Sequence, residues 1–397
     1  MSLESEIRGN IEKLSNTNTI VKCAALNALQ DRAYHQINRD VLRNAGIIPP
    51  VVILLSDSNA EVKALAIDLL NRLIDSPDDK ETVRAMRNTN VIPPVVQLLS
   101  NPNDRIKEKA ASVLELLIGG IFGHDLTKDA IRNANGINPL ILMLENTKAR
   151  NASLCTLLSL IRMHEVNKTA FFDAKGLPAV IRYIHNGNYY GTAAEIIAEL
   201  SMIERYKDPI REAGGITTLL LILNRNESSQ NRVNDDIISI LKALQYLTKN
   251  NPTNRDAVRN DRGILPIVKL LDKDSFCDYS RQYSARILWY LSHENQINKD
   301  AIRNAGGIDL LVKLLSSDRE ETRQVSISTL KSLIYQNENN KKAVANAMAL
   351  PVLSRLAETE SNEQTKKSCQ EIVTFLYAQF DNVRLSNLKM SGFTLGF

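Results

Sequence analysis

The sequence predicts an all-α solenoid of about nine three-helix repeats, and three observations support this fold class. The stretch Asn254–Leu271 returns as Asn298–Leu315 with eleven of eighteen positions identical, at a displacement of 44 residues. A period of this length is typical of stacked helical repeats. Aromatic residues make up only 5% of the chain and hydrophobic residues 44%, so small aliphatic side chains are expected to fill the interior. Weaker copies run along the chain, and their turn residues lie 39 to 48 residues apart: Gly46, Asn90, Gly136, Gly176, Gly215, Gly263, Gly307 and Ala349.

Each repeat is expected to begin with a short first helix that an asparagine caps. The side-chain oxygen of such a residue accepts hydrogen bonds from the first backbone amides. Arg-Asn pairs such as Arg303-Asn304 come near the end of this helix, where a cation favours the carbonyl terminus. The turn residue that follows is expected to be left-handed, a conformation that glycine adopts without strain. The expected caps are Asn38, Asn167, Asn254, Asn298 and Asn340.

The second and third helices follow from proline placement and apolar spacing. Proline stands in the first turn of the second helix, as in Pro49-Pro50 and Pro93-Pro94, where a missing backbone amide costs little. The third helix is the longest, and its apolar residues recur at helical spacing. We expect the third helices to form the inner wall of the array. In the segment 61–74 the apolar positions are Val62, Leu65, Ala66, Leu69, Leu70 and Leu73.

The predicted organisation is a capping helix at residues 1–16, a solenoid at 17–380 and a tail at 381–397. Ile7, Ile11 and Leu14 fall on one face of the capping helix. The tail breaks the repeat pattern, so we expect it to be flexible or to cap the last repeat. Two long turns, within 224–236 and 272–283, are expected before the third helices of repeats six and seven.

Composition and motifs argue against several function classes. The net charge of +4 is small and basic residues are interleaved with acidic ones, so nucleic acid is not an expected partner. The four cysteines lack CxxC spacing, which is typical of reduced thiols in the cytoplasm or the nucleus. Neither a membrane span nor a lipid anchor is expected. Histidines are dispersed and no nucleotide-binding or catalytic motif is present, so we expect no metal, no cofactor and no enzymatic activity.

The short first helix, the Gly turn, the Ile/Leu-Pro-x-Val/Leu-Val-x-Leu-Leu second helix and the Ala-rich third helix resemble the armadillo-repeat family from about residue 17 to 380. The resemblance implies a right-handed superhelix of the importin-α and β-catenin kind, which binds proteins along a concave face formed by third helices. The family includes adhesion scaffolds, nuclear-import adaptors, small-GTPase regulators and myosin chaperones. It therefore specifies the fold more closely than the function.

Importin-α-like and β-catenin-like members hold an extended peptide with an Asn late in the third helix and a Trp four residues earlier. This chain has neither residue at the matching positions, so recognition of nuclear-localisation signals of the familiar kind is not expected. The single tryptophan, Trp289, lies one residue before the Asn position, and we expect it to pack on the flank against a neighbouring repeat. The Asn position carries Asp31, Arg72, Leu116, Ser159, Glu199, Tyr246, Tyr290, Ser332 and Phe375. The Trp position carries Asn27, Asp68, Ser112, Cys155, Glu195, Lys242, Arg286, Ser328 and Glu371.

These positions define the candidate binding surface, because residues at i, i−4 and i−7 share one helix face. Repeats three and four are nearly neutral there. Tyr246, Arg286 and Tyr290 form the strongest candidate, since Tyr and Arg are enriched at the centres of interfaces. The alternative is that each is an ordinary solvated side chain. The candidate partner-binding residues are Asp31, Asp68, Arg72, Glu195, Glu199, Lys242, Tyr246, Tyr283, Arg286 and Tyr290.

The predicted function is that of a non-enzymatic scaffold or adaptor, which binds partner proteins or extended peptides along the concave face. An alternative is a regulator or chaperone that grips a folded client, such as a small GTPase or a motor domain. A nuclear-import adaptor is less favoured, because the Trp and Asn positions carry other residues.

Overall fold

The computed structural model describes residues 3–74, 79–119, 125–146, 148–186, 189–225, 234–272 and 277–390. Within these ranges every regular element is an α-helix, from α1 to α26, and no strand is present. The helices follow one another in repeating triplets of a short first, a short second and a long third helix. This arrangement confirms the predicted all-α solenoid of armadillo-type repeats.

Capping helix α1 spans Leu3–Lys13, and eight triplets follow the first long helix, α2. The first helices are α3 (Gln36–Asn44), α6 (Lys80–Asn88), α9 (Asp125–Asn133), α12 (Glu165–Asp173), α15 (Glu204–Glu212), α18 (Pro252–Asn260), α21 (Gln296–Asn304) and α24 (Glu338–Asn346). The second helices are α4 (Ile48–Leu54), α7 (Ile92–Leu98), α10 (Ile137–Asn146), α13 (Gly176–Asn186), α16 (Gly215–Arg225), α19 (Ile264–Lys269), α22 (Gly307–Leu314) and α25 (Ala349–Thr359). The third helices are α2 (Thr19–Ala33), α5 (Ala60–Leu73), α8 (Asp104–Ile118), α11 (Arg150–Ile161), α14 (Tyr190–Ser201), α17 (Asn234–Thr248), α20 (Asp278–Ser292), α23 (Glu320–Ile334) and α26 (Glu363–Met390).

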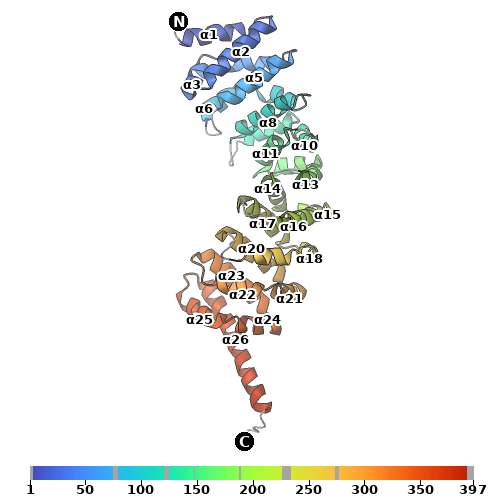
Figure 1. Cartoon of the computed structure of the whole chain (residues 1–397), viewed down its shortest axis with the longest axis vertical. Coiled ribbons are helices and arrows are strands. Elements are labelled where there is room, and N and C mark those ends of the chain that lie inside the picture. Colours follow the sequence, from blue (N-terminus) through green and yellow to red (C-terminus); the bar gives the residue numbers. More distant parts are fainter. Residues whose placement is uncertain are drawn as a thin grey trace. The chain divides into compact units, whose positions relative to one another are not determined.

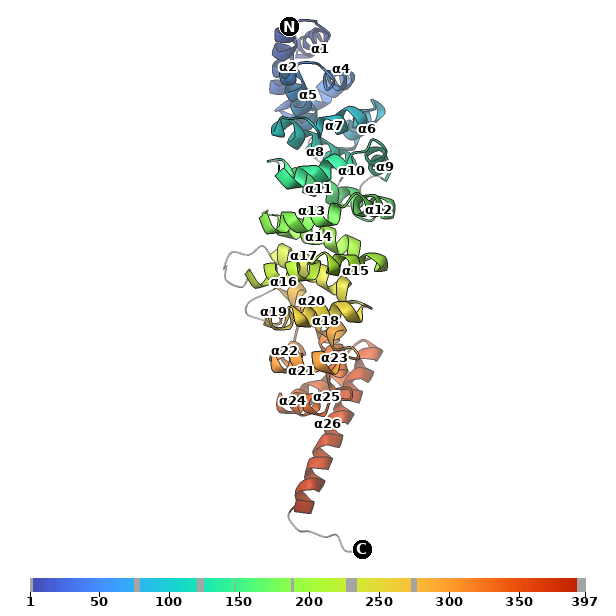
Figure 2. The same cartoon turned by 90° about the vertical axis from the view of Figure 1, so that its right-hand side faces the viewer.

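The chain divides into two compact units, Met1–Glu199 and Leu200–Phe397. In the first unit α2, α5, α8 and α11 pack in sequence order, and in the second unit α17, α20, α23 and α26 do the same. Figures 1 and 2 show these third helices as successive layers within each unit, with the first helices together on another side. Each repeat therefore contacts mainly its neighbours in the chain, as expected of an array.

The third helices are buried more completely than the sequence pattern predicts. In α5, Val62 and Leu69 are fully buried as expected, whereas Leu65 is only half-buried. Ile67 and the carboxylate-bearing Asp68 are buried in addition. The reason is geometric, because α5 packs on its own second helix α4 and also on the third helices before and after it.

The predicted capping asparagines have a different role. Asn298 lies three residues inside α21, is fully buried, and donates from Nδ2 to the Leu291 carbonyl oxygen of α20 at 2.9 Å. The cap is Asn295, whose side chain accepts a hydrogen bond from the Asn298 backbone amide at 3.0 Å. Asn251 and Asn337 cap in the same way before Asn254 and Asn340, and His164 caps before Asn167. The predicted caps of these four helices are therefore wrong by one helical turn.

The Arg-Asn pairs also join repeats instead of only ending a helix. Arg259 donates from Nη1 to the Asn298 side chain of the next repeat at 2.9 Å, and Arg303 donates to Asn340 at 2.8 Å. Arg132 makes the same contact with Asn167 in the first unit. Each buried asparagine therefore connects two repeats through hydrogen bonds in which one donor carries a charge.

Buried lysines connect the first helix and the third helix within a repeat. Lys299 donates from Nζ to the backbone carbonyl of Tyr335, at the end of the next third helix, at 2.6 Å. Lys128 and Lys207 reach the equivalent carbonyls of Arg162 and Lys249. Such a contact satisfies a terminal helix carbonyl that has no intrahelical partner. Burial lowers the pKa of both Lys128 and Lys299.

The left-handed turn residue lies one position earlier than predicted in six of the eight repeats. Gly306 has φ +79° and Gly307 does not, whereas Gly46 and Asn90 are left-handed as expected. Gly307 is required for another reason, since a Cβ atom there would lie 2.8 Å from Ile302 Cγ2 and 3.0 Å from its carbonyl oxygen. The glycine thus permits close packing of the second helix on the first.

At the ends of the chain, α1 buries Ile7 and is followed by buried Leu14, with Ile11 half-buried. Helix α26 continues to Met390 and crosses the predicted boundary at 380/381; its end projects beyond α24 and α25 in Figures 1 and 2. Residues 391–397 and most of the predicted long turn within 224–236 lie outside the described residues. The second long turn ends earlier than predicted, because Tyr283 belongs to α20, which begins at Asp278.

Candidate binding surface

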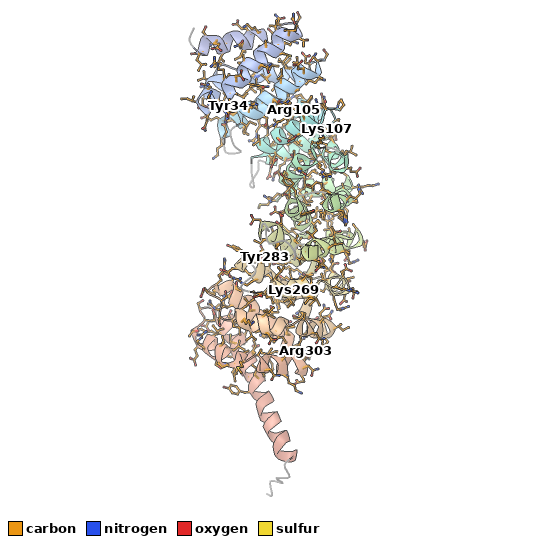
Figure 3. All side chains as sticks on the ribbon, viewed as in Figure 1. Tyr34, Arg105, Lys107, Lys269, Tyr283 and Arg303 are labelled. Atoms are coloured by element: carbon orange, nitrogen blue, oxygen red, sulfur yellow. The ribbon has the colours of Figure 1, made fainter. Side chains whose placement is uncertain are left out.

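Five of the predicted residues come together on two neighbouring third helices. Lys242 and Tyr246 lie on α17, Tyr283, Arg286 and Tyr290 lie on α20, and the two helices pack against each other. All five side chains are partly exposed. We call this group the Tyr/Arg cluster. Figure 3 labels Tyr283 on the left of the second unit, whereas Arg303, on a first helix, is labelled to the right.

Tyr283 and Tyr290 are hydrogen-bond donors placed beside cations. Burial raises the pKa of Tyr283 and of Tyr290 above the usual value for a phenol. The Arg286 guanidinium opposes both shifts, and Arg255 of α18 opposes the shift at Tyr290. Both hydroxyls therefore keep their protons at physiological pH and can donate hydrogen bonds.

Trp289 extends the cluster with a further aromatic ring. It is 37% exposed, and its ring centroid lies 5.1 Å from that of Tyr290 with the planes tilted by 31°. The sequence predicts packing against a neighbouring repeat, but more than a third of this side chain faces solvent. A partly exposed tryptophan beside tyrosine and arginine is a composition typical of interface centres.

Three of the four acidic candidates are engaged in ion pairs within the chain. Asp68 is only 5% exposed and binds Arg105 of the next third helix. Glu195 binds Arg162, and Glu199 contacts Lys168 at 2.9 Å. Asp68 and Glu195 therefore connect adjacent repeats of the first unit, and Glu199 connects the first and third helices of one repeat.

The two remaining candidates, Asp31 and Arg72, are exposed on α2 and α5. Neither forms a hydrogen bond or an ion pair with another described residue, as expected of solvated side chains. The structure thus gathers five of the ten candidates, and it places the other five on α2, α5 and α14.

One charged residue near the predicted neutral positions was missed. Glu115 on α8 is half-buried without an ion pair among the described residues, and burial raises the pKa of its carboxyl. It also acts on Cys155 of α11, where burial and this nearby carboxylate raise the thiol pKa to about 11. Glu115 lies one residue before the Asn position, where Trp289 stands in its own repeat, so the position already noted for Trp289 was the signal that could have indicated Glu115.

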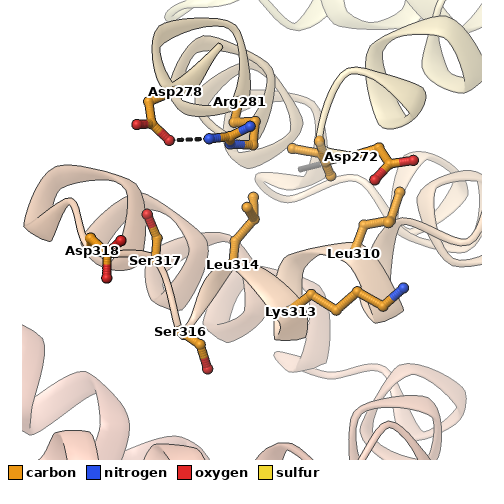
Figure 4. A pocket seen from close by; sticks show the side chains of 10 residues that line it. Asp272, Asp278, Arg281, Leu310, Lys313, Leu314, Ser316, Ser317 and Asp318 are labelled. Atoms are coloured by element: carbon orange, nitrogen blue, oxygen red, sulfur yellow. Dashed lines mark hydrogen bonds and ion pairs between the residues drawn. The ribbon is translucent and has the colours of Figure 1, made fainter. Parts of the chain in front are cut away.

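A pocket of about 400 Å³ lies elsewhere in the second unit, between the turn before α20 and the turn after α22. Figure 4 shows Leu310, Lys313 and Leu314 on one side of it and Asp278 paired with Arg281 on another. No residue of the Tyr/Arg cluster lines this pocket. It is therefore a separate surface feature with mixed apolar and charged walls.

Among the residues described, no group of His, Cys, Asp and Glu is arranged to hold a metal ion. In the same part of the chain, no helix is both long and apolar enough to cross a membrane. The four cysteines are free thiols, of which only Cys369 is buried.

Comparisons with solved structures support the fold. A crystal structure of an engineered protein aligns with a TM-score of 0.79 at 21% identity, over 94% of this chain and 88% of that chain. A structure from work on the phosphorylation switch that controls the interaction between cadherin and beta-catenin aligns with a TM-score of 0.73 at 15% identity, over 92% of this chain and 68% of that chain. At these identities the likeness concerns the fold alone, and it confirms the armadillo-type architecture.

Sequence comparison gives a narrower result. Among curated proteins no significant match is found. The sequence pattern of one family, that of the V-ATPase H subunit, matches residues 30–367, which is most of the chain. The match includes every triplet, except that α26 continues beyond it. The chain belongs to the V-ATPase H-subunit family.

Proposed function

We propose that this protein is a non-enzymatic scaffold that binds a partner protein, or an extended segment of one, along its third helices, with the Tyr/Arg cluster at the centre. The proposal depends on one observation: three tyrosines, one arginine and one lysine lie on α17 and α20, which pack against each other. Aromatic rings and guanidinium groups provide large contact areas and directed hydrogen bonds at modest entropic cost.

A scaffold role is also consistent with the ion pairs that join the helices of the first unit. The carboxylates Asp68 and Glu195 join adjacent repeats and Glu199 joins two helices of one repeat, so these ion pairs stabilise the array. Residues that are not used in this way remain available for a partner. A third helix that is fixed on both sides presents its exposed face rigidly, which reduces the entropy lost on binding.

Family membership supplies a candidate partner. We propose that the chain works in the cytoplasm as the H subunit of a V-ATPase, and that the partner is another component of that assembly. A nuclear role remains the alternative that the reduced cysteines permit. The alternative of a regulator or chaperone that grips a folded client uses the same surface and differs in the partner.

The experiment compares the intact chain with a variant that combines Tyr246→Ala, Arg286→Ala and Tyr290→Ala. Partner proteins are captured from cells and quantified by mass spectrometry, with V-ATPase components as the candidate set. A control combines Tyr377→Ala with Lys342→Ala, which removes an exposed ring and an exposed charge away from the cluster. The proposal requires selective loss of one partner in the triple variant, with unchanged thermal stability. Retention of every partner by a folded triple variant would show that the cluster is not the binding centre.

A further inference from the structure

The cations of the Tyr/Arg cluster differ from four carboxylates of the third helices in having no ion-pair partner among the described residues, as Asp31 and Arg72 also have none. Asp68, Glu195 and Glu199 each contact a basic side chain of the same unit. Glu371, at the equivalent position of α26, contacts Lys331 at 2.5 Å. Arg286 and Lys242 have no hydrogen bond and no ion pair with another described residue. The array therefore neutralises these carboxylates internally and leaves the two cations of the cluster without an anion.

Among the described residues, no carboxylate acts on the two tyrosine hydroxyls beside Arg286, whereas Glu294 acts on Arg255, the other cation beside Tyr290. The groups that act electrostatically on the Tyr283 and Tyr290 hydroxyls are Tyr246, Tyr279, Arg255 and Arg286, and none of them is a carboxylate. The next third helix, α23, carries Ser328 and Ser332 at the equivalent positions. A partly buried guanidinium without a nearby acid loses hydration and gains nothing in return until an anion binds.

The donors of the cluster match an anionic oxygen ligand. Tyr283, Arg286 and Tyr290 lie at positions i, i+3 and i+7 of α20, so they share one face of that helix. Lys242 and Tyr246 are one turn apart on the adjoining α17. Protonated hydroxyls, an ammonium and a guanidinium can all donate, whereas a carboxylate, the acceptor that would favour a basic ligand, is absent from the set.

From this geometry we infer that the Tyr/Arg cluster binds an acidic peptide segment, in which Asp or Glu carboxylates pair with Arg286 and Lys242 while apolar or aromatic side chains pack on the exposed rings. This inference rests on the proposed function and adds the chemistry of the partner. It concerns a carboxylate and not a phosphate, because the cluster contains a single arginine, whereas recognition of phosphorylated motifs generally uses a cluster of arginines. The exposed ring of Trp289 and the partly exposed ring of Tyr290 provide the apolar part of the surface.

The test uses a fluorescein-labelled nine-residue peptide, Gly-Glu-Phe-Glu-Leu-Asp-Phe-Glu-Gly, with binding to the full chain followed by fluorescence anisotropy. Three matched peptides carry Gln and Asn, Lys, or phosphoserine in place of the acidic residues. The affinity of the acidic peptide is expected to be at least about tenfold higher than that of the amide peptide, because a hydrogen bond to a charged group contributes about that factor. Its affinity should fall between 50 and 300 mM salt, since partly exposed charges are screened.

Variants of the protein locate the site. Arg286→Met is expected to lower the affinity for the acidic peptide by about tenfold or more and to leave the affinity for the amide peptide unchanged. The matched control is Lys342→Met, which removes one exposed charge on α24 and should leave both affinities unchanged. Arg286→Lys keeps the charge but loses the bidentate geometry, so its affinity should be intermediate. Circular dichroism and thermal melting establish that each variant is folded.

Four results would overturn the inference: no binding of the acidic peptide, equal binding of the acidic and amide peptides, equal effects of Arg286→Met and Lys342→Met, or binding of the phosphoserine peptide alone. Any of these can be separated from failure of the proposed function. If the triple alanine variant still loses its cellular partner, the cluster is the binding surface and only the acidic chemistry is wrong. If that variant keeps every partner, the scaffold proposal itself fails at this surface.

Discussion

Replacement of Asn298 by alanine tests the finding that buried asparagines connect adjacent repeats. The side chain is fully buried at the start of α21 and makes two contacts that alanine cannot make. Nδ2 donates to the Leu291 carbonyl oxygen at 2.9 Å, and Oδ1 accepts from Arg259 Nη1 at 2.9 Å. The substitution therefore removes one neutral and one charge-assisted hydrogen bond, and it leaves the Leu291 carbonyl without this donor.

The expected cost follows from these contacts. A neutral hydrogen bond contributes about 1 kcal/mol and a bond to a charged donor about 1.5–3 kcal/mol. We therefore expect Asn298→Ala to destabilise the packing of α20 and α21 by about 2–4 kcal/mol. The matched control is Asn304→Ala at the exposed end of the same helix, where the side chain accepts from Arg303 Nη2 at 3.2 Å. A surface change of that kind should stay within about 0.5 kcal/mol.

The assay is native-state hydrogen exchange of the α20 and α21 amides, because an array can unfold in parts and a single melting temperature would mix its repeats. A double-mutant cycle with Arg259→Met adds a second measurement, since a direct contact gives a coupling energy of about 0.5–3 kcal/mol. If Asn298→Ala costs no more than Asn304→Ala, or if the two substitutions of the cycle are additive, Asn298 is not a connection between repeats.

Three further predictions follow from single positions. Gly307→Ala should lower the melting temperature, because the added Cβ would lie 2.8 Å from Ile302 Cγ2. Gly9→Ala in α1 should not lower it, because no atom lies within 4 Å of the added Cβ. Equal effects of the two substitutions would contradict the packing role of Gly307. Glu115→Gln should stabilise the chain at neutral pH but not at a pH below the usual glutamate pKa. The pKa of Glu115 is raised in the folded chain, so its ionisation lowers the free energy of unfolding as the pH rises. Denaturant titrations at several pH values measure this free energy, and a difference between variant and parent that does not depend on pH would argue against the prediction. Cys155, whose pKa is raised to about 11, should react slowly with iodoacetamide at pH 8 and faster at higher pH, and fast labelling of the folded chain at pH 8 would show that its thiol is not held protonated.

The helix triplets could be predicted because their signals are local. Proline in the first turn of α4 and α7 and apolar spacing in α5 act within a few residues, and the structure contains these helices where the pattern places them. The repetition also allows the pattern of the clearest copies to be extended to the weaker ones. Local consistency of this kind is what makes an array predictable from its sequence.

The roles of the repeated asparagines could not be predicted because two candidates stand three residues apart. Asn295 and Asn298 are both able to cap α21, and only the packing decides between them. The deciding partners are the Leu291 carbonyl in the preceding third helix and Arg259 in the preceding repeat. A single copy of the motif does not contain that information. The constant spacing of Arg and Asn between copies was the signal that could have indicated a contact between repeats.

The candidate site was predictable in its residue types but not in its pairing. Asp68 and Arg286 occupy equivalent positions of their helices and would be equally plausible contacts for a partner on composition alone. In the structure Asp68 is buried against Arg105, which lies 37 residues later, whereas Arg286 has no such partner among the described residues. Whether a charge is neutralised depends on the next repeat, so it cannot be read from the helix that carries the charge.

The same dependence explains how one repeat can be specialised within a uniform array. Each third helix needs connections to its neighbours, and the Lys299 and Asn298 contacts provide them from the first helices, away from the face that carries the Tyr/Arg cluster. Because packing is secured there, the exposed positions of α20 can carry Tyr283, Arg286 and Tyr290 without loss of the stack. Affinity for a partner can then be changed by substitution at these positions alone, which predicts that Arg286→Met leaves the exchange protection of α20 unchanged while Asn298→Ala lowers it. A loss of protection in Arg286→Met comparable to that in Asn298→Ala would mean that binding and packing are not separated in this repeat.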